Sequence, residues 1–150
     1  VSLILTPHHG QLEERLAEQE SYVVVLDATS GAVVRTEELN GVILGQGLTN
    51  GSLAVETARA YYPAGDGKGA VTVYSLTDTS AAPASFATDQ WLIGIDDGAL
   101  LLSPQSLAAE RRDEMPVTLT RVDTRGRELG TIEGVTAPDL KHWERPKQHQ

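Results

Sequence analysis

The chain has 150 residues, 40% of them hydrophobic, so it is long enough and apolar enough for one globular domain with a core. Its formal net charge of −9 argues against nucleic acid and anionic membrane surfaces as partners, because an acidic surface repels phosphate groups. The absence of cysteine excludes disulfides, thiolate catalysis and cysteine-ligated zinc, and no apolar run approaches the roughly 20 residues of a membrane-spanning helix.

Short stretches of alternating apolar and polar residues, bounded by glycine, asparagine and aspartate, predict an almost entirely antiparallel β chain. A helical pattern is confined to Gln11–Gln19 and Ser106–Glu114, where apolar residues lie among charged ones. Gly134-Val135 is predicted to begin a further strand, as Gly41-Val42 does. The predicted strands, in chain order, are Ser21–Leu26, Val33–Glu38, Gly41–Gly47, Ser52–Thr57, Ala70–Leu76, Ser85–Thr88, Trp91–Asp96, Ala99–Ser103, Val117–Val122 and Glu128–Glu133.

Two kinds of turn separate these strands. Asn50-Gly51 and Asp97-Gly98 each lie between two predicted strands, and the type I′ hairpin turn favours these residues because both of its central positions need a positive φ. We therefore expect equivalent hairpins at the two places. Asp27 and Asp123 instead open longer turns that contain a glycine, and each carboxylate is expected to accept hydrogen bonds from backbone N–H groups of its own turn.

The chain repeats itself with a period of about 48 residues. Residues 2–7, SLILTP, resemble residues 99–104, ALLLSP, and the segment around Asp27 resembles the segment around Asp123 at nearly the same offset. A middle copy is visible where residues 44–53, LGQGLTNGSL, resemble residues 93–100, IGIDDGAL. Each full unit holds four short antiparallel strands, which is the pattern of a β-propeller blade.

We expect three units, at approximately residues 1–40, 41–90 and 91–137, followed by a polar tail at 138–150. The first unit lacks its first strand, so the chain holds about two and a half units, whereas propellers typically have 4–8 blades. The prediction is an all-β chain of four-stranded blade-like repeats that form part of a β-propeller. A β-sandwich or β-barrel built from the same hairpins is the alternative.

The segment Val24-Val25-Leu26-Asp27-Ala28-Thr29-Ser30-Gly31 resembles the repeat of quinoprotein-type (PQQ-like) β-propeller proteins. That repeat runs from a strand through Leu-Asp-Ala-x-Thr-Gly into a strand with a tryptophan. Here the Thr-Gly pair is displaced by one residue, and the tryptophan position near Arg35 is polar. The family includes envelope assembly scaffolds, exported binding proteins and quinone-dependent dehydrogenases. Because the adjacent cysteine pair of the dehydrogenases is missing, the resemblance implies a noncatalytic member without a cofactor.

Pattern and resemblance together predict a noncatalytic binding or scaffold module that is extracytoplasmic or associated with the cell envelope; a cytoplasmic location is the alternative. Its expected partners are another protein, the remainder of a larger propeller or further copies of the same chain. Two other functions stay open. One is a hydrolase or lyase with carboxylates at the centre of the propeller, and the other is a purely structural segment of a larger protein.

Tyr61 and Tyr62, on a glycine-rich connection that also holds Asp66 and Lys68, are the leading candidates for contact with a ligand or partner. Adjacent tyrosines on a loop present a large amphipathic surface. The alternative is that one tyrosine packs against its own unit while the other is merely exposed. The segment around Asp66 and Lys68 lacks the spacing of a Walker phosphate loop.

Asp96 is a further candidate, because turn formation explains Asp97 but not the aspartate before it. Paired carboxylates can share a proton or hold a calcium ion. His8 and His9 are the candidate metal ligands, suited by their chemistry to zinc or nickel. Their spacing fits no metal motif, and a solvated loop is the favoured interpretation.

Overall fold

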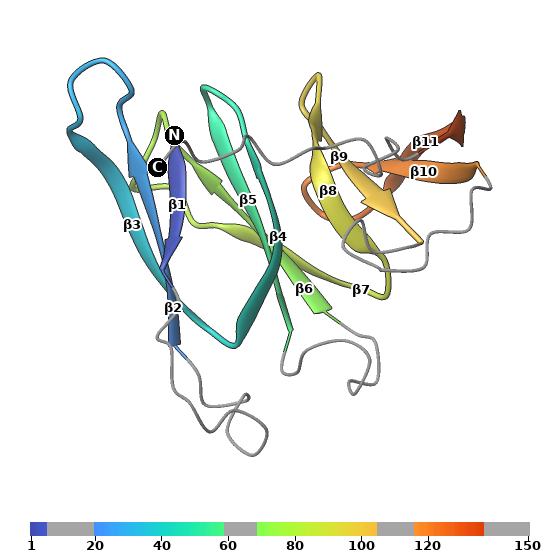
Figure 1. Cartoon of the computed structure of the whole chain (residues 1–150), viewed down its shortest axis with the longest axis horizontal. Helices are drawn as coiled ribbons and strands as arrows, with labels where there is room; N and C mark the ends of the chain where they lie inside the picture. The colour runs from blue at the N-terminus through green and yellow to red at the C-terminus, as the bar shows by residue number, and fades with distance from the viewer. Residues whose placement is uncertain (6–19, 59–68, 105–115, 137–150) are drawn as a thin grey trace, which may run out of the picture.

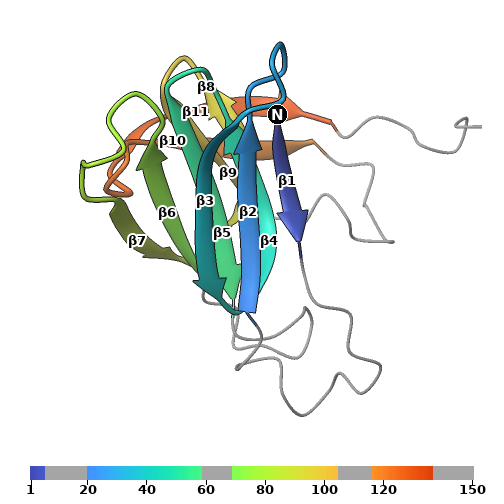
Figure 2. The same cartoon turned by 90° about the vertical axis from the view of Figure 1, so that its left-hand side faces the viewer.

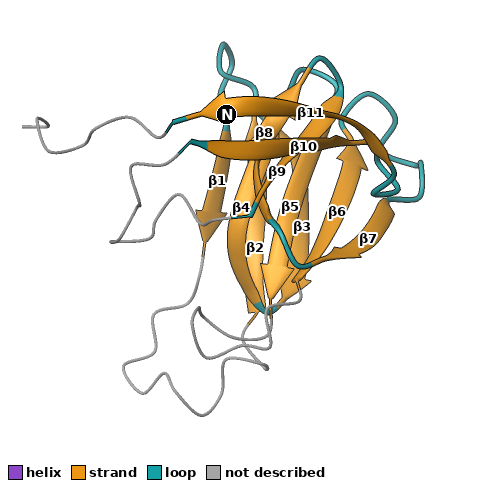
Figure 3. Cartoon of the chain, turned by 90° about the vertical axis from the view of Figure 1, so that its right-hand side faces the viewer, coloured by secondary structure: helices purple, strands orange, loops and turns teal. Residues whose placement is uncertain are grey.

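The structure, a computed structural model, describes residues 1–5, 20–58, 69–104 and 116–136, and the statements below concern those residues. They form strands joined by turns, with no helix among them (Figure 3). Within the described ranges, no helix is long and apolar enough to cross a membrane. The strands are β1 (Ser2–Leu5), β2 (Glu20–Leu26), β3 (Val33–Asn40), β4 (Val42–Leu48), β5 (Ser52–Ala58), β6 (Gly69–Ser75), β7 (Ala84–Thr88), β8 (Trp91–Asp96), β9 (Ala99–Ser103), β10 (Val117–Val122) and β11 (Glu128–Val135).

The strands build three antiparallel sheets in which neighbouring strands follow chain order. The first sheet contains β1–β3, the second β4–β7 and the third β8–β11. Figure 1 shows the second sheet between the other two, and Figure 2 shows the first sheet lying in front of the second. The strands that begin the second and third sheets, β4 and β8, are called the leading strands below.

The prediction of an all-β chain of antiparallel sheets is confirmed for the described residues. Every strand predicted up to Glu133 is present, with ends that differ by at most two residues. The predicted helices at Gln11–Gln19 and Ser106–Glu114 lie outside the described residues. The sheets do not close into a ring within the described part of the chain, so the propeller remains a proposal.

The expectation that Gly134-Val135 begins a new strand is wrong. Val135 pairs with Val117 in the third sheet, so β11 continues to this residue. The pairing register slips between Val117 and Leu119, and Gly134 adopts a φ of 70°. Glycine reaches this conformation without steric cost. Gly134 therefore forms an irregularity inside β11, whereas Gly41 lies just before β4, which begins at Val42.

The second sheet packs on both of its faces. Neighbouring residues of β5 point to opposite faces, as in any strand, and here both faces are covered. The cluster between the first and second sheets contains Val23, Val25, Leu53, Val55 and Tyr74. The cluster between the second and third sheets contains Ala54, Val71, Val73, Leu92, Leu100, Leu102 and Val122.

The leading strands pass each other at close range through two glycines of β4. A Cβ atom added to Gly45 would overlap the carbonyl oxygen of Leu92 on β8. One added to Gly47 would lie 2.8 Å from the Ile95 side chain. Glycine permits this approach because it has no Cβ atom.

Both leading strands carry a bulge at the same position. The register with the following strand slips between Ile43 and Gly45 in β4, and between Leu92 and Gly94 in β8. A bulge leaves one residue unpaired and increases the local twist. The shared bulge, just before an aligned glycine, shows that the second and third sheets repeat each other in backbone detail as well as in sequence.

The two predicted hairpin turns are not equivalent. Asp97 and Gly98 have φ angles of 46° and 77°, as a type I′ turn requires. Neither Asn50 nor Gly51 adopts a left-handed φ, so the prediction for that turn is wrong. The reason is Thr49, whose Oγ1 accepts the N–H groups of Gly51 at 3.3 Å and of the following residue at 3.1 Å. The turn at Asn50-Gly51 is thus closed by the Thr49 side chain, whereas the turn at Asp97-Gly98 is closed by its backbone conformation.

This difference predicts unequal effects of one substitution. Gly98→Val should destabilise the fold by about 1 kcal/mol or more, because a β-branched residue resists positive φ. Gly51→Val, where no atom lies within 4 Å of an added Cβ, should cost less than about 0.5 kcal/mol. Urea unfolding of both variants at one protein concentration measures the difference. Equal losses would show that the two turns share a conformation.

Candidate functional site

Most candidate site residues taken from the sequence lie outside the described residues, and their roles stay predictions. They are Tyr61, Tyr62, Asp66, Lys68, His8 and His9. Among the residues that the structure describes, no group of three or more histidine, cysteine, aspartate or glutamate side chains is placed to hold a metal ion.

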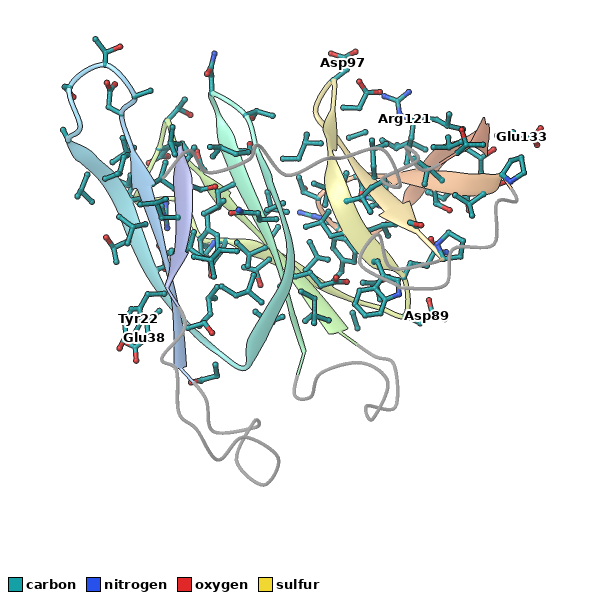
Figure 4. All side chains as sticks on the ribbon, in the orientation of Figure 1. Tyr22, Glu38, Asp89, Asp97, Arg121 and Glu133 are labelled. Atoms are coloured by element: carbon teal, nitrogen blue, oxygen red, sulfur yellow. The ribbon has the colours of Figure 1, made fainter. Side chains whose placement is uncertain are left out.

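Asp96 lies at the end of β8 with an exposed side chain. Its carboxylate is 3.8 Å from the Arg121 guanidinium of β10, and Figure 4 shows Arg121 beside the hairpin that carries Asp97. An ion pair exposed to this degree contributes roughly 0–1 kcal/mol. The structure therefore accounts for Asp96 by a surface ion pair and for Asp97 by the turn, whose left-handed φ it adopts.

The turn aspartates have the structural role that the sequence predicts. One carboxylate oxygen of Asp27 accepts two backbone N–H groups of its own turn, each at 2.9 Å, and Asp123 does the same. Asp78, in the middle copy, accepts the N–H and the hydroxyl of Ser80. Because hydrogen bonds favour the ionised form, they hold the pKa of all three carboxyls below its usual value.

The structure adds a residue that the sequence analysis does not single out, Glu56 on β5. Its side chain is 2% exposed and points towards the third sheet, where Oε1 accepts the backbone N–H of Leu92 on β8 at 3.3 Å. Burial raises the pKa of Glu56 to about 7, against the opposing effect of the Leu92 hydrogen bond. Glu56 therefore exchanges a proton near neutral pH inside the packing between two sheets.

Glu56 and Gly45 act on the same peptide segment of β8. Gly45 lies opposite Glu56 in the β4–β5 pairing and leaves space for the Leu92 carbonyl oxygen, while Glu56 accepts the Leu92 N–H. Gly45, Glu56 and Leu92 are called the inter-sheet contact below. A general acid or base must reach its substrate. The burial of Glu56 instead couples its protonation to the packing of the second sheet on the third.

The sequence contained a signal for Glu56. Leu53, Ala54 and Val55 are three consecutive apolar residues, a pattern that indicates a strand buried on both faces. Glu56 follows in phase with Ala54, so it had to point into one of the two buried layers. Only the packing of the third sheet identifies its partner.

A second polar contact joins the first sheet to the second. The Arg35 guanidinium of β3 lies 5.0 Å from the centre of the Tyr74 ring on β6, a cation–π distance. Arg35 also donates to the Ser75 carbonyl oxygen at 2.8 Å and pairs with Glu37. Burial, and then the charge of Glu37, raise the pKa of the Tyr74 hydroxyl. Arg35 thus links the first and second sheets by charge and stacking.

Comparisons of the chain with protein-family models, with curated proteins and with solved structures found no match. The functional conclusion therefore depends on the fold, on these contacts and on the sequence pattern.

Proposed function

We propose that this chain is a noncatalytic segment of a β-propeller and serves as a scaffold or binding module for a protein or small ligand. The observation that carries the proposal is the second sheet, which buries an apolar cluster on each face against a different neighbour. Blades of a propeller are arranged in this way, each between the preceding and the following blade.

The outer face of the first sheet supports the proposal. Leu3 is 45% exposed and pairs with Val24, and both point away from the second sheet because Val23 and Val25 point towards it. Apolar side chains therefore lie on both faces of this sheet as well, although only one face is covered by a described sheet. A large exposed apolar surface commonly marks an interaction site. Here its natural cover is a further sheet.

The leading strands supply a second line of support. β4 and β8 lie in direct contact between the second and third sheets, through Gly45 and Gly47. Blades converge in this way on the axis of a propeller, with the first strand of each blade innermost.

A binding role is favoured over catalysis by two considerations. The resemblance to quinoprotein-type repeats is to noncatalytic members, and it also supports an extracytoplasmic or envelope-associated location. In addition, the carboxyl with a pKa near neutrality, that of Glu56, is buried and holds a backbone N–H. It is therefore engaged in packing rather than placed to meet a substrate.

The proposal predicts that the isolated chain self-associates, because no described sheet covers its outer sheet faces, which further blades would cover in a propeller. Sedimentation velocity across a range of concentrations should show species larger than the monomer. Leu3→Lys, which puts a charge on the outer face of the first sheet, should weaken association at least tenfold. Thr29→Lys, in an exposed turn of the same sheet, is the matched control. A compact monomer that unfolds cooperatively at every concentration would contradict the proposal and favour a sandwich or barrel.

A further inference from the structure

We infer that the outer edge of β1 is a docking site for one added β-strand, and that its occupant is the leading strand of another repeat with the pattern apolar–apolar–Gly–x–Gly. This inference rests on the proposed function, because it treats the first sheet as a blade that lacks one strand. It identifies the part of the partner that the first sheet binds.

Within the described residues, the first sheet contains no counterpart of the leading strands. In the second and third sheets, β4 and β8 pair antiparallel with the strand that follows them. β1 occupies the position of that following strand, since it pairs with β2 as β5 pairs with β6. Its other edge pairs with no described strand. The repeat thus defines the missing element: one strand, antiparallel to β1, on the side away from β2.

The hydrogen-bonding groups of that edge can be assigned. Val1 donates its N–H to the Leu26 carbonyl at 3.0 Å and accepts the Leu26 N–H at 2.7 Å. Hydrogen-bonded pairs alternate with non-hydrogen-bonded pairs along an antiparallel ladder. The backbone groups of Leu3 therefore face β2, whereas the N–H and C=O of Ser2 and Ile4 face outward. Unpaired groups of this kind are a template for an added strand.

Apolar side chains flank the same edge. Ile4 is 37% exposed and pairs with a buried valine of β2, so it points towards the second sheet. Leu48 of β4 is 36% exposed and pairs with buried Leu53, so it points towards the first sheet. The hydroxyl of Ser2 donates to the Gln46 side chain of β4 at 2.8 Å, which fixes how closely β1 and β4 lie. A strand added beside β1 would pack on β4 and cover Ile4 and Leu48.

The glycines specify which strand fits. β4 packs against β8 through Gly45 and Gly47, and a side chain at Gly45 would meet a backbone oxygen. A strand that packs on β4 by the same geometry needs small residues at the same two positions. In the printed sequence, two aliphatic residues directly before a glycine occur in β4 and β8, which are already paired, and no glycine follows Gly134. The printed residues after β11 therefore do not carry the pattern, which favours the leading strand of another repeat as the occupant.

The test uses a labelled synthetic peptide with the sequence of residues 41–49, GVILGQGLT, added to the full 150-residue chain. Fluorescence polarisation should show saturable binding. A control peptide with valine at both inner glycine positions should bind at least tenfold more weakly, because its side chains would collide with β4.

Two variants of the chain locate the binding. Ile4→Pro removes an outward N–H and leaves the bonds between β1 and β2 intact, so it should weaken peptide binding at least tenfold. Ile4→Val keeps the N–H and should bind within about twofold of the parent chain. The same hydrogen-bond ladder can be tested without altering the chain. Two peptides are N-methylated at backbone nitrogens, one along each edge of the strand. Only the peptide methylated along the edge that pairs with β1 should lose binding.

Each outcome has a separate meaning. Absence of peptide binding, or equal binding by the Ile4→Pro chain, would overturn the docking inference even if sedimentation shows self-association, and the propeller proposal would then stand. If the chain is strictly monomeric and still binds the peptide, the docking inference stands. The propeller proposal, which predicts self-association, would then be overturned. If Ile4→Pro abolishes self-association and the peptide does not compete with it, the edge is occupied by a second copy, and the proposed occupant is wrong.

Discussion

Replacing Glu56 by glutamine is expected to remove most of the pH dependence of folding stability between pH 4.5 and 8. The folded state raises the pKa of Glu56 from 4.5 to about 7, whereas the unfolded chain leaves it at its usual value. Between these two values the folded state binds one more proton than the unfolded state. Its stability therefore falls as the pH rises through this window, and the loss is complete above about pH 7.

The expected loss is about 2 kcal/mol. A shift of one pKa unit corresponds to about 1.4 kcal/mol, and residual screening by water reduces the sum over the full shift. Glutamine has the same shape, carries no charge at any pH and can still accept the Leu92 N–H. The parent and the Glu56→Gln variant should therefore be similar in stability at pH 4.5, and the variant should be more stable at pH 8.

Urea unfolding at fixed protein concentration, at half-unit steps of pH, measures this difference. Titrations common to both proteins cancel when the variant is compared with its parent. Glu133→Gln, which removes an exposed carboxylate of β11, is the matched control for the loss of one negative charge. Parallel pH profiles for the parent and Glu56→Gln would show that folding leaves the pKa of Glu56 at its usual value, and that this residue does not couple pH to packing.

The strands could be predicted because their causes are local. Alternation of apolar and polar residues defines β8 and β9, and the Asp97-Gly98 turn between them follows from the two residues that form it. Asn50-Gly51 has the same turn signature, yet the preceding threonine closes that turn in another way. A dipeptide rule considers only the central residues, so it fails where a neighbouring side chain competes for the same N–H groups.

The pairing registers of strands and the contacts between sheets could not be predicted in the same way. The sequence aligns Ser2 with Ala99. In the structure Ser2 pairs with Val25, two residues before the turn at Asp27, and the residue that pairs two positions before the turn at Asp123 is Leu101. Strand pairing therefore makes Ser2 equivalent to Leu101. The shift is two residues, which keeps each side chain on its face and so leaves the apolar pattern unchanged. Sequence similarity alone does not resolve such a shift. The partner of Glu56 depends instead on how the third sheet packs on the second, which no local sequence pattern shows.

Gly45→Ala is expected to destabilise the chain by about 3 kcal/mol. The new Cβ atom would overlap the backbone oxygen of Leu92, and a main-chain atom cannot move aside as a side chain does, so the third sheet must shift as a whole. Gly94 of β8 is the matched control. It is aligned with Gly45 in the repeat and has the same bulge before it, but no atom lies within 4 Å of an added Cβ. Gly94→Ala should change stability by less than about 0.5 kcal/mol.

The same substitution should also alter the titration of Glu56, because Gly45 lies against the carbonyl oxygen of Leu92 and Glu56 accepts the N–H of the same residue. A shift of Leu92 away from β4 admits water to the Glu56 carboxyl, which lowers its raised pKa. Loss of the Leu92 N–H acts in the opposite direction, but burial is the larger cause, so the pKa returns towards its usual value. Gly45→Ala should therefore have a flatter pH profile of stability than the parent, whereas Gly94→Ala should keep the parental slope. If Gly45→Ala loses stability but keeps the full pH slope of the parent, the Gly45–Leu92 contact and the Glu56–Leu92 hydrogen bond are independent. The inter-sheet contact would then not act as a unit.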